Sequence, residues 1–513
     1  MKKIFLLSAI LSAALLLSGC VNQFLDVKPS KSTTVVIETG EHLNALLNNY
    51  KNFYLAYSPW MINGTDDLEC SVDTYAITGS NNCDVYLPTI LTYATWNTDL
   101  VPQQSDWTWG NEYTKIFYAN AILENADKVS GLTDSERESI KREAHFLRAY
   151  DLWYLAQIYC LPYISGNEDK QGLVLKTSTQ FDEPLKRATL KETYDFIEAD
   201  LAEALKIDTP LEKIPGTERW RSFRANKAAV NGFAARYYFY LNDYTNALKY
   251  ADLALAAHSQ LVDYNTEMRY MNPVTVNVAG RTETILLPYT FNSGSGTVND
   301  FMFEWKEFMY FRMEEDHNWW YLPSESLTSL YDQTYDLRYK YHFIPNYSCY
   351  VKSMDARIPA YVFFWKDRLP GGPTTPEMLL IKAECEARAG NVSAAMTTVN
   401  RLRAVRMDKT APADVINLSA STKEDAVKKI LEERRREMPF AKRLWDIRRL
   451  NYNADSFDDV GDITKTFYDF DLNNINKGAT KTYTLGNNST KIACPLPQTE
   501  IVAADGTIEQ NVY

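Results

Sequence analysis

The sequence predicts a mostly helical protein, in which long irregular insertions interrupt a scaffold of paired helices. Apolar residues recur every three or four positions in several separate stretches, and residues typical of helix starts and stops bound those stretches. The chain has 513 residues, of which 45% are hydrophobic and 23% charged. A chain of this length and composition can bury a large core, so the sequence excludes a disordered protein and a small disulfide-held scaffold.

The first twenty residues have the pattern of a secretory signal. Lys2 and Lys3 form a basic start, the apolar stretch 4–17 follows, and the signal ends in Ser18-Gly19-Cys20. A cysteine at this place looks like a bacterial lipobox, where cleavage leaves the cysteine as an acylated first residue. We therefore expect a signal peptide at 1–19 and lipid attachment at Cys20, since two or more acyl chains give stable anchoring. The alternative is an ordinary cleaved signal that leaves Cys20 free.

The mature chain is acidic. Removal of 1–19 takes away two lysines, which changes the formal net charge from −12 to −14. This field disfavours phosphate-rich partners, and no cluster of Lys and Arg is interleaved with aromatics, so nucleic acid is not an expected ligand. No segment after the signal has the roughly 20 apolar residues that would span a bilayer. Cys70 and Cys83 could bridge a small loop, and the alternative is buried, unpaired thiols.

Helical spacing begins near Glu41 and returns in several places. Residues 111–130 and 134–158 predict one helix pair, and a capping box of Thr and Glu at 133 and 136 opens its second member. A second capping box, at 189 and 192, opens a helix that runs to Leu205. The stretch 58–109 has polar turns and scattered aromatics instead, which predict long loops.

Two further helix pairs have short turns between their members. They cover 225–241 with 244–257, and 376–390 with 391–406, and small residues recur where the helices must approach. A helix-turn-helix unit of about 34 residues is typical of a tetratricopeptide repeat, so we expect several such units. Ordinary antiparallel helix pairs are the alternative.

A second insertion covers 262–372. It contains two stretches that predict strands, 275–278 and 284–287, then a Gly/Ser loop and an aromatic-rich run from 301 to 321. The part after 451 again has no sustained period, which predicts an irregular C-terminal region.

Catalytic and metal-binding signatures fail when their spacing is checked. The sequence has no H-E-x-x-H helix, no G-x-S-x-G elbow and no phosphate-binding G-x-x-x-x-G-K-[ST] loop. A calcium-like start at Asp469 lacks the required glycine and glutamate, since Asn474 and Thr480 stand there, and predicts an ordinary turn. We therefore expect no catalytic residues, no metal and no cofactor.

Aromatic residues are the unusual feature of the composition. The chain contains 34 Tyr, 22 Phe and 11 Trp. Trp153 and Trp445 lie on apolar helix faces and are expected in the core. Half-exposed rings in loops suit sugars, which have an apolar face and hydroxyl edges, and the alternative is that loop tryptophans fold inward as anchors. Tryptophans expected in irregular parts of the two insertions are Trp60, Trp96, Trp305, Trp319, Trp320 and Trp365.

Taken together, the motifs resemble those of the SusD/RagB family of outer-membrane nutrient-binding lipoproteins. No motif alone would be specific, but the series runs from end to end. Its members are Cys20 with Phe24-Leu25-Asp26, Asn111-Glu112-Tyr113 through Ala119-Asn120, Arg142-Glu143-Ala144-His145-Phe146-Leu147-Arg148-Ala149-Tyr150 with Leu161-Pro162, Val399-Asn400-Arg401-Leu402-Arg403, Leu431-Glu432-Glu433-Arg434-Arg435-Arg436-Glu437, Arg443-Leu444-Trp445-Asp446-Ile447-Arg448-Arg449, and Pro495-Leu496-Pro497 with Gln510-Asn511.

The chain departs from the family pattern in two loops. Family members usually have a glutamate and a glycine before the Arg443 motif, where this chain has Pro439-Phe440-Ala441-Lys442. The glycine usual before Pro162 is replaced by Cys160 or Leu161. Both motifs are structural in the family, so the departures concern loop geometry.

The resemblance implies one SusD-like domain over 20–513, with about four tetratricopeptide-like units. It implies a lipid-anchored outer-membrane protein, exposed on the cell surface, that captures oligosaccharide and delivers it to a SusC-like TonB-dependent transporter. It implies no enzymatic activity, and ligand residues vary within the family, so none carries over. The alternatives are the same architecture binding oligopeptides, a tetratricopeptide interaction scaffold, and a glycan-active enzyme.

We expect the ligand site in the insertions around 58–109 and 262–372, since a rigid helical array leaves such insertions free to build one face. Trp319 and Trp320 adjoin, so one ring should point outward while the other anchors the loop. Exposed rings would stack on sugars and a carboxylate would accept hydrogen bonds from hydroxyls. The residues predicted to bind ligand are Asp66, Trp96, Trp305, Trp319 and Trp320.

Overall fold

A computed structural model describes residues 37–180, 185–292, 302–316 and 320–513. The signal, Cys20 and Trp319 lie outside these ranges. Within them, no helix has both the length and the apolar character needed to cross a membrane.

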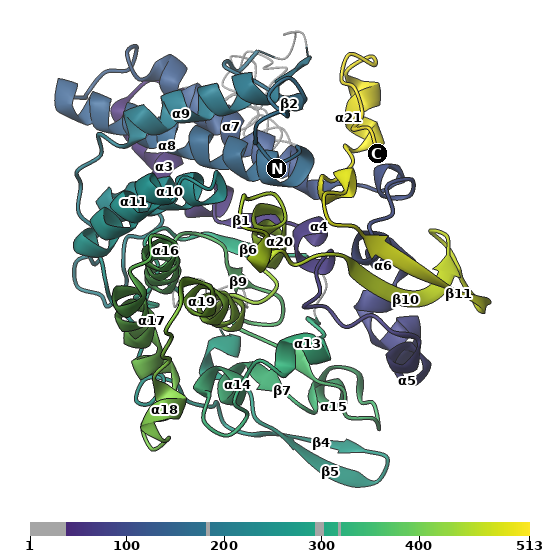
Figure 1. Cartoon of the computed structure of the whole chain (residues 1–513). Coiled ribbons are helices and arrows are strands. Elements are labelled where there is room, and N and C mark those ends of the chain that lie inside the picture. The colour runs from purple at the N-terminus through teal and green to yellow at the C-terminus, as the bar shows by residue number, and fades with distance from the viewer. Residues whose placement is uncertain (1–36, 181–184, 293–301, 317–319) are drawn as a thin grey trace, which may run out of the picture.

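Helices dominate, and they pack as antiparallel neighbours along the chain (Figure 1). The contacts run from α7 to α8 to α9, and from α10 through α11 and α16 to α17 and α19. The predicted mostly helical scaffold is confirmed. The helices of this scaffold are α7 (Trp107–Asn125), α8 (Asp134–Tyr159), α9 (Leu190–Ala204), α10 (Lys227–Tyr240), α11 (Tyr244–Ala257), α16 (Thr375–Arg388), α17 (Val392–Arg406) and α19 (Lys423–Glu437).

Local signals start and stop these helices as expected. In both predicted capping boxes, at Thr133 and Thr189, the side chain accepts the backbone N–H of the glutamate three residues on, and the glutamate accepts in return. Asn242 ends α10 with a φ of 60°, and Gly390 ends α16 with a φ of 83°. Both take the left-handed conformation that lets one helix end and its partner turn back.

The first insertion is more regular than predicted. The expectation of long loops over 58–109 is wrong, because the segment folds into α4 (Pro59–Asn63), α5 (Val72–Asn82) and α6 (Pro88–Ala94). These helices have 5, 11 and 7 residues. Helices this short show little periodicity. Pro59 and Pro88 stand in the first turns of α4 and α6, but proline is as common in loops as at helix starts, so neither residue distinguishes the two.

The second insertion contributes to a small sheet with the order β1-β6-β9. β1 (Leu55–Tyr57) pairs in parallel with β6 (Met313–Glu315), and β6 pairs antiparallel with β9 (Leu369–Pro370). The predicted strand 275–278 is confirmed as part of β4 (Val274–Val278), which forms a hairpin with β5 (Arg281–Ile285). The second predicted strand, 284–287, overlaps β5 only at 284 and 285. The sheet therefore joins the segment just before the first insertion to two segments of the second.

The expectation of an irregular C-terminal region is wrong for 463–485. β10 (Ile463–Phe470) and β11 (Ile475–Leu485) form a hairpin that extends from the body of the molecule (Figure 1). Buried and exposed residues alternate along β10 with the period of two that marks a half-buried strand. The calcium-like segment is the turn of this hairpin, where a carboxylate oxygen of Asp471 accepts the N–H groups of Asn473 and Asn474.

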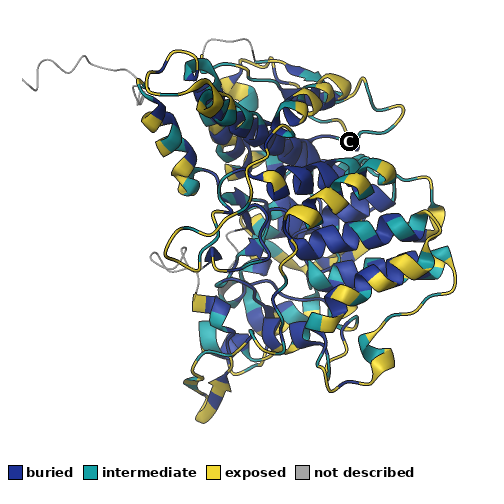
Figure 2. Cartoon of the chain, turned by 90° about the vertical axis from the view of Figure 1, so that its left-hand side faces the viewer, coloured by how far each residue is buried: buried dark blue, intermediate teal, exposed yellow. Residues whose placement is uncertain are grey.

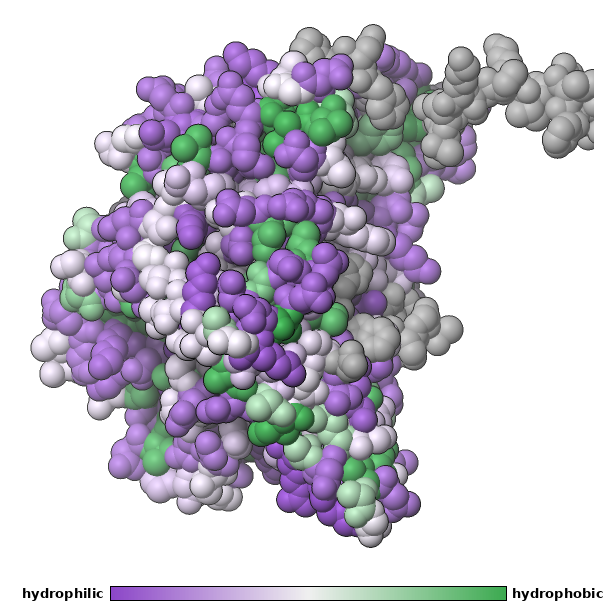
Figure 3. Space-filling model, turned by 90° about the vertical axis from the view of Figure 1, so that its right-hand side faces the viewer, coloured by the Kyte–Doolittle hydropathy of each residue, from purple (hydrophilic) through white to green (hydrophobic). Residues whose placement is uncertain are grey.

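The core lies between the helix layers and under the insertions. Helices are buried on their inner faces and exposed on their outer ones (Figure 2). Trp153 and Trp445 are both in this core, with ring centroids 5.1 Å apart, which confirms their predicted placement. Among the described residues all six cysteines after Cys20 are buried and unpaired. On the side that carries α21 (Gln498–Ala503), α5 and the β10–β11 hairpin, the surface is largely hydrophilic with separate hydrophobic groups (Figure 3).

Candidate functional site

Two of the predicted ligand residues are core residues. Trp96 is fully buried, and its indole N–H donates to the Gly64 carbonyl oxygen at 2.9 Å. Trp305 is 4% exposed and packs against the rings of Phe363 and Phe364. The expectation of an exposed ring at Trp96 or Trp305 is wrong, because folding of the insertions brings apolar partners over both rings, a long-range effect with no local sequence signal.

Trp320 is also covered, with 1% of its surface exposed. Its indole N–H donates to the Pro359 carbonyl oxygen at 2.7 Å, so this ring anchors its loop. Trp320 also lines a cavity of about 290 Å³. Trp319 lies outside the described residues, and its role stays a prediction.

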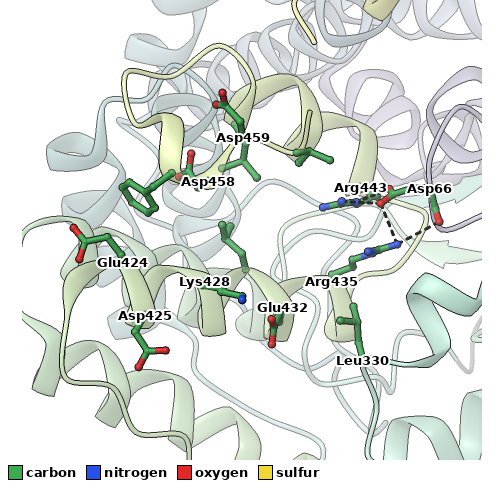
Figure 4. Close-up of a pocket in the computed structure, with 14 residues that line it drawn as sticks. Asp66, Leu330, Glu424, Asp425, Lys428, Glu432, Arg435, Arg443, Asp458 and Asp459 are labelled. Carbon is green, nitrogen blue, oxygen red and sulfur yellow. Dashed lines mark hydrogen bonds and ion pairs between the residues drawn. The ribbon is translucent and has the colours of Figure 1, made fainter. Parts of the chain in front are cut away.

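Asp66 lies in a different place, at one end of a cavity of about 650 Å³ (Figure 4). Its carboxylate accepts two hydrogen bonds from Arg443, at 2.7 and 2.8 Å, and Arg435 lies 3.2 Å away. Burial opposes ionisation of this group, but the two guanidinium groups outweigh it and hold the pKa of Asp66 well below its usual value. The carboxylate thus forms ion pairs with two arginines. A ligand-binding role for it stays a prediction.

We call this space the charged cavity. One face of α19 forms a wall, with Glu424, Lys428 and Glu432 at successive turns. Asp459 lies opposite (Figure 4), and Phe457, 43% exposed, is also part of the lining. Acids outnumber bases around it, and Trp96, Trp305 and Trp320 are not part of its lining.

A second group of side chains crosses the β1-β6-β9 sheet. Tyr57 at the end of β1 pairs with Glu315 at the end of β6. The antiparallel register of β6 and β9 places Arg368 beside Glu315, and the Arg368 Nε lies 3.3 Å from a Glu315 carboxylate oxygen. Three segments far apart in sequence therefore place a phenol, a carboxylate and a guanidinium in one line.

An aromatic ring flanks each end of this line. Trp107 lies against Tyr57, with ring centroids 6.0 Å apart and planes at 68°. At the other end the Arg368 guanidinium lies 5.4 Å from the Trp365 ring centroid. We call the five residues the aromatic row, and they are, in order, Trp107, Tyr57, Glu315, Arg368 and Trp365.

Trp107 is the most exposed aromatic ring of the row, at 63%. It is the first residue of α7, and Asp106 caps that helix by accepting the Thr108 N–H at 2.7 Å. The cap fixes the start of the helix, so the indole projects from a rigid element. An apolar ring this exposed contributes little to folding, which makes it a candidate for contact with a ligand.

Trp365 stands in a tight turn. Phe364 and Arg368 exchange two backbone hydrogen bonds, of 3.0 and 3.1 Å, which close a three-residue loop. Trp365 has a φ of 50°, a left-handed conformation that is costly for a bulky residue. Such strain persists where the surroundings impose it and is concentrated at functional sites. The half-buried ring is held in place beside Arg368.

The polar centre of the row is partly withdrawn from water. Burial, and then the charge of Glu315, raise the pKa of Tyr57 to about 12, so its hydroxyl stays protonated and can donate. Burial likewise raises the pKa of Glu315. The row offers a donor, an acceptor and a cation between two indole rings.

A smaller cavity lies near the row and is lined by Lys366, the residue after Trp365. It has a volume of about 290 Å³, and its aromatic walls are Trp320 and Tyr350. Lys366 connects the two features, because it lines the cavity while its Nζ lies 5.6 Å from the Trp365 ring centroid. We call this space the lysine cavity, and its lining is Asp84, Trp320, Tyr350, Val351, Lys352 and Lys366.

The sequence does not signal most of this site. The sequence around Trp107 indicates only the start of a helix, and Tyr57 and Arg368 belong to no recognisable sequence motif. Trp365 is noticeable only as a loop tryptophan. Over the described ranges, no group of three or more His, Cys, Asp or Glu side chains is arranged to hold a metal ion.

Comparisons with known proteins agree on the family. Residues 23–240 match the family model described as "Starch-binding associating with outer membrane", and residues 375–513 match the model of the SusD family. No curated protein matches the chain.

Solved structures with the same fold cover nearly the whole chain. A putative sugar binding protein from Bacteroides vulgatus is 18% identical, with 93% of this chain and 99% of that one covered and a TM-score of 0.62. A SusD superfamily protein from Bacteroides fragilis is 19% identical, with 91% and 98% covered and a TM-score of 0.60. A laminarin binding SusD-like protein is 16% identical, with 93% and 99% covered and a TM-score of 0.55. The two family models together match well over half of the chain, which therefore belongs to the SusD/RagB family.

Proposed function

We propose that this protein is a cell-surface lipoprotein that binds oligosaccharides on the aromatic row and delivers them to a SusC-like TonB-dependent outer-membrane transporter, without catalysis. The observation that carries the proposal is the row itself, in which Trp107 and Trp365 flank the hydrogen-bonding groups of Tyr57, Glu315 and Arg368. Laminarin and sugar binding by proteins of the same fold support it.

The chemistry of the row suits a sugar chain. An indole face stacks on the apolar face of a pyranose, and each such contact contributes about 2 kcal/mol. Hydroxyl groups at the sugar edges can accept from the Tyr57 hydroxyl and the Arg368 guanidinium and donate to Glu315. These polar groups already satisfy one another, so a sugar hydroxyl can join their network without leaving a buried charge unpaired.

Binding is tested with the soluble form that lacks residues 1–20, screened against glycans and peptides and then titrated calorimetrically with the best ligand. Trp107→Ala and Trp365→Ala should each weaken glycan binding by about 30-fold, the equivalent of one stacking contact. The thermal transition of Trp107→Ala should stay close to that of the parent, because this ring is 63% exposed.

Phe457→Ala is the matched control, since this ring is also exposed but lines the charged cavity. It should leave the affinity unchanged. Full affinity in both tryptophan variants would place the ligand elsewhere, and selective capture of peptides would favour the oligopeptide alternative.

Anchoring and delivery have separate tests. Cys20→Ala should move the protein from the membrane to the soluble fraction, because the acyl chains on this cysteine are the proposed anchor. If the variant still sediments with outer membranes of a strain that lacks the transporter, the anchor is wrong. Extraction in mild detergent should recover the lipoprotein with a large barrel partner, and repeated recovery of the lone chain would refute delivery to a transporter.

A further inference from the structure

We propose that the oligosaccharide taken by this protein carries anionic groups, carboxylates or sulfates, and that the lysine cavity receives one of them. This inference rests on the proposed glycan-binding function and names the class of glycan. It starts from the chemistry of this cavity, which Lys366 links to the aromatic row.

The first observation is the size and wall chemistry of the cavity. Its volume of about 290 Å³ is the space that about ten water molecules fill in the liquid, which is enough for one sugar unit. Tyr350 supplies most of the aromatic surface, because Trp320 is only 1% exposed and is fixed by its hydrogen bond to Pro359. A preformed space with aromatic walls and a few polar groups is the usual form of a small-ligand site.

The second observation is that Lys352 keeps its hydrogen-bonding capacity. Within the described part of the chain its one ion pair is with Asp84, where Nζ and the carboxylate oxygen are 3.9 Å apart, beyond hydrogen-bond distance. An ammonium group has three donors, and Lys352 is 32% exposed at the side chain. The group can therefore bind an anion without breaking an existing hydrogen bond.

The third observation is the sign of the local charge. The chain has a net charge of −12, and acids outnumber bases around the charged cavity. In the lysine cavity the balance is reversed, with Lys352 and Lys366 against Asp84. Both ammonium groups border one small cavity, and their field favours an anion there. Neutral sugars are bound by amide, hydroxyl and carboxylate groups and need no such pair.

Lys366 links the lysine cavity to the aromatic row. Because its Nζ lies 5.6 Å from the Trp365 ring centroid, a sugar stacked on Trp365 lies next to the cavity entrance. A substituent at the edge of that sugar, such as a C6 carboxylate or sulfate, then reaches the ammonium groups. The aromatic row supplies stacking, and the lysine cavity supplies discrimination by charge.

The experiment uses matched probes. A panel of neutral hexasaccharides is titrated into the soluble form lacking residues 1–20, together with the same hexasaccharides oxidised to uronates at carbon 6 or sulfated there. We expect at least one charged form to bind about tenfold more tightly than its neutral parent at low ionic strength. This advantage should shrink at about 0.5 M NaCl, where exposed charges are screened. The uronate and sulfate arms identify which anion is recognised.

Variants locate the effect. Lys352→Gln and Lys366→Gln should each lower the affinity for the charged hexasaccharide by about fivefold or more and leave the neutral one unchanged. Lys428→Gln is the matched control, because this lysine lines the charged cavity and should have no effect on either probe. Trp107→Ala should weaken both probes equally.

The outcomes separate this inference from the proposed function. Equal or weaker binding of every charged probe, with clear binding of a neutral one, overturns the inference and leaves glycan binding intact. An unchanged preference for the charged probe in both lysine variants also overturns it, since the anion then binds elsewhere. Failure of every hexasaccharide to bind refutes the glycan-binding function itself.

Discussion

Replacement of Phe440 by alanine should destabilise the protein more than replacement by glycine, the reverse of the usual order. Phe440 follows α19 in a three-residue turn closed by a hydrogen bond of 2.7 Å from the Ala441 N–H to the Pro439 carbonyl oxygen. Its φ is 61°, and it stands in the loop where family members usually have a glycine. A side chain in this left-handed conformation costs about 1 to 2 kcal/mol, which glycine does not incur.

The ring of Phe440 offsets this cost. It is fully buried, with ring centroids 5.4 Å from Tyr321 and 5.7 Å from Tyr361, and the Phe440 N–H donates to Asp67 at 2.7 Å. Loss of a buried phenylalanine ring costs about 3 to 5 kcal/mol. Phe440→Ala loses the ring and keeps the strain. Phe440→Gly also loses the ring but relieves the strain, at a cost of about 0.4 to 1 kcal/mol in unfolded-state entropy.

We therefore expect Phe440→Gly to be more stable than Phe440→Ala by about 1 kcal/mol. Phe233, fully buried inside α10, is the matched control. There glycine should be less stable than alanine by about 1 kcal/mol, because the helix interior disfavours it. Urea unfolding followed by circular dichroism measures all four variants at one pH. The reasoning is refuted if glycine is the less stable replacement at both positions by similar amounts.

Two buried bases should give the stability a measurable dependence on pH. Burial lowers the pKa of His342 to about 3, so stability is complete above the unfolded value near 6.5 and falls as the pH drops toward 3. His342→Gln should reduce this dependence of the unfolding free energy on pH, by as much as about 1 kcal/mol per pH unit. If urea titrations give the same change of unfolding free energy with pH for both proteins, the assignment is wrong. Burial also lowers the pKa of Lys442, to about 7, so stability should rise with pH from about 7 toward the unfolded value near 10.5. Lys442→Met should remove much of the rise between pH 7 and 9, and a parent protein whose stability does not increase over that window would rule this out.

Local sequence signals were sufficient for the helical scaffold. Each capping box needs only residues three positions apart, and an amphipathic helix shows its buried face in its own periodicity. The same periodicity predicted the burial of Trp153 and Trp445, because a long helix repeats its apolar spacing over several turns. It failed for 58–109, where helices of only a few turns resemble loops, and for the β10–β11 hairpin.

The binding surface could not be predicted in the same way, because long-range packing decides which rings are exposed. Trp96 and Trp305 have loop-like surroundings in sequence, yet distant segments cover them. Tyr57, Glu315 and Arg368 meet only through the register of β1, β6 and β9, and more than 250 positions separate the first two. The amino-acid sequence thus determines the family and the scaffold through local, repeated signals. The aromatic row and the lysine cavity exist only where the folded chain brings remote segments together, since strand pairing and burial are properties of contacts that no short stretch contains.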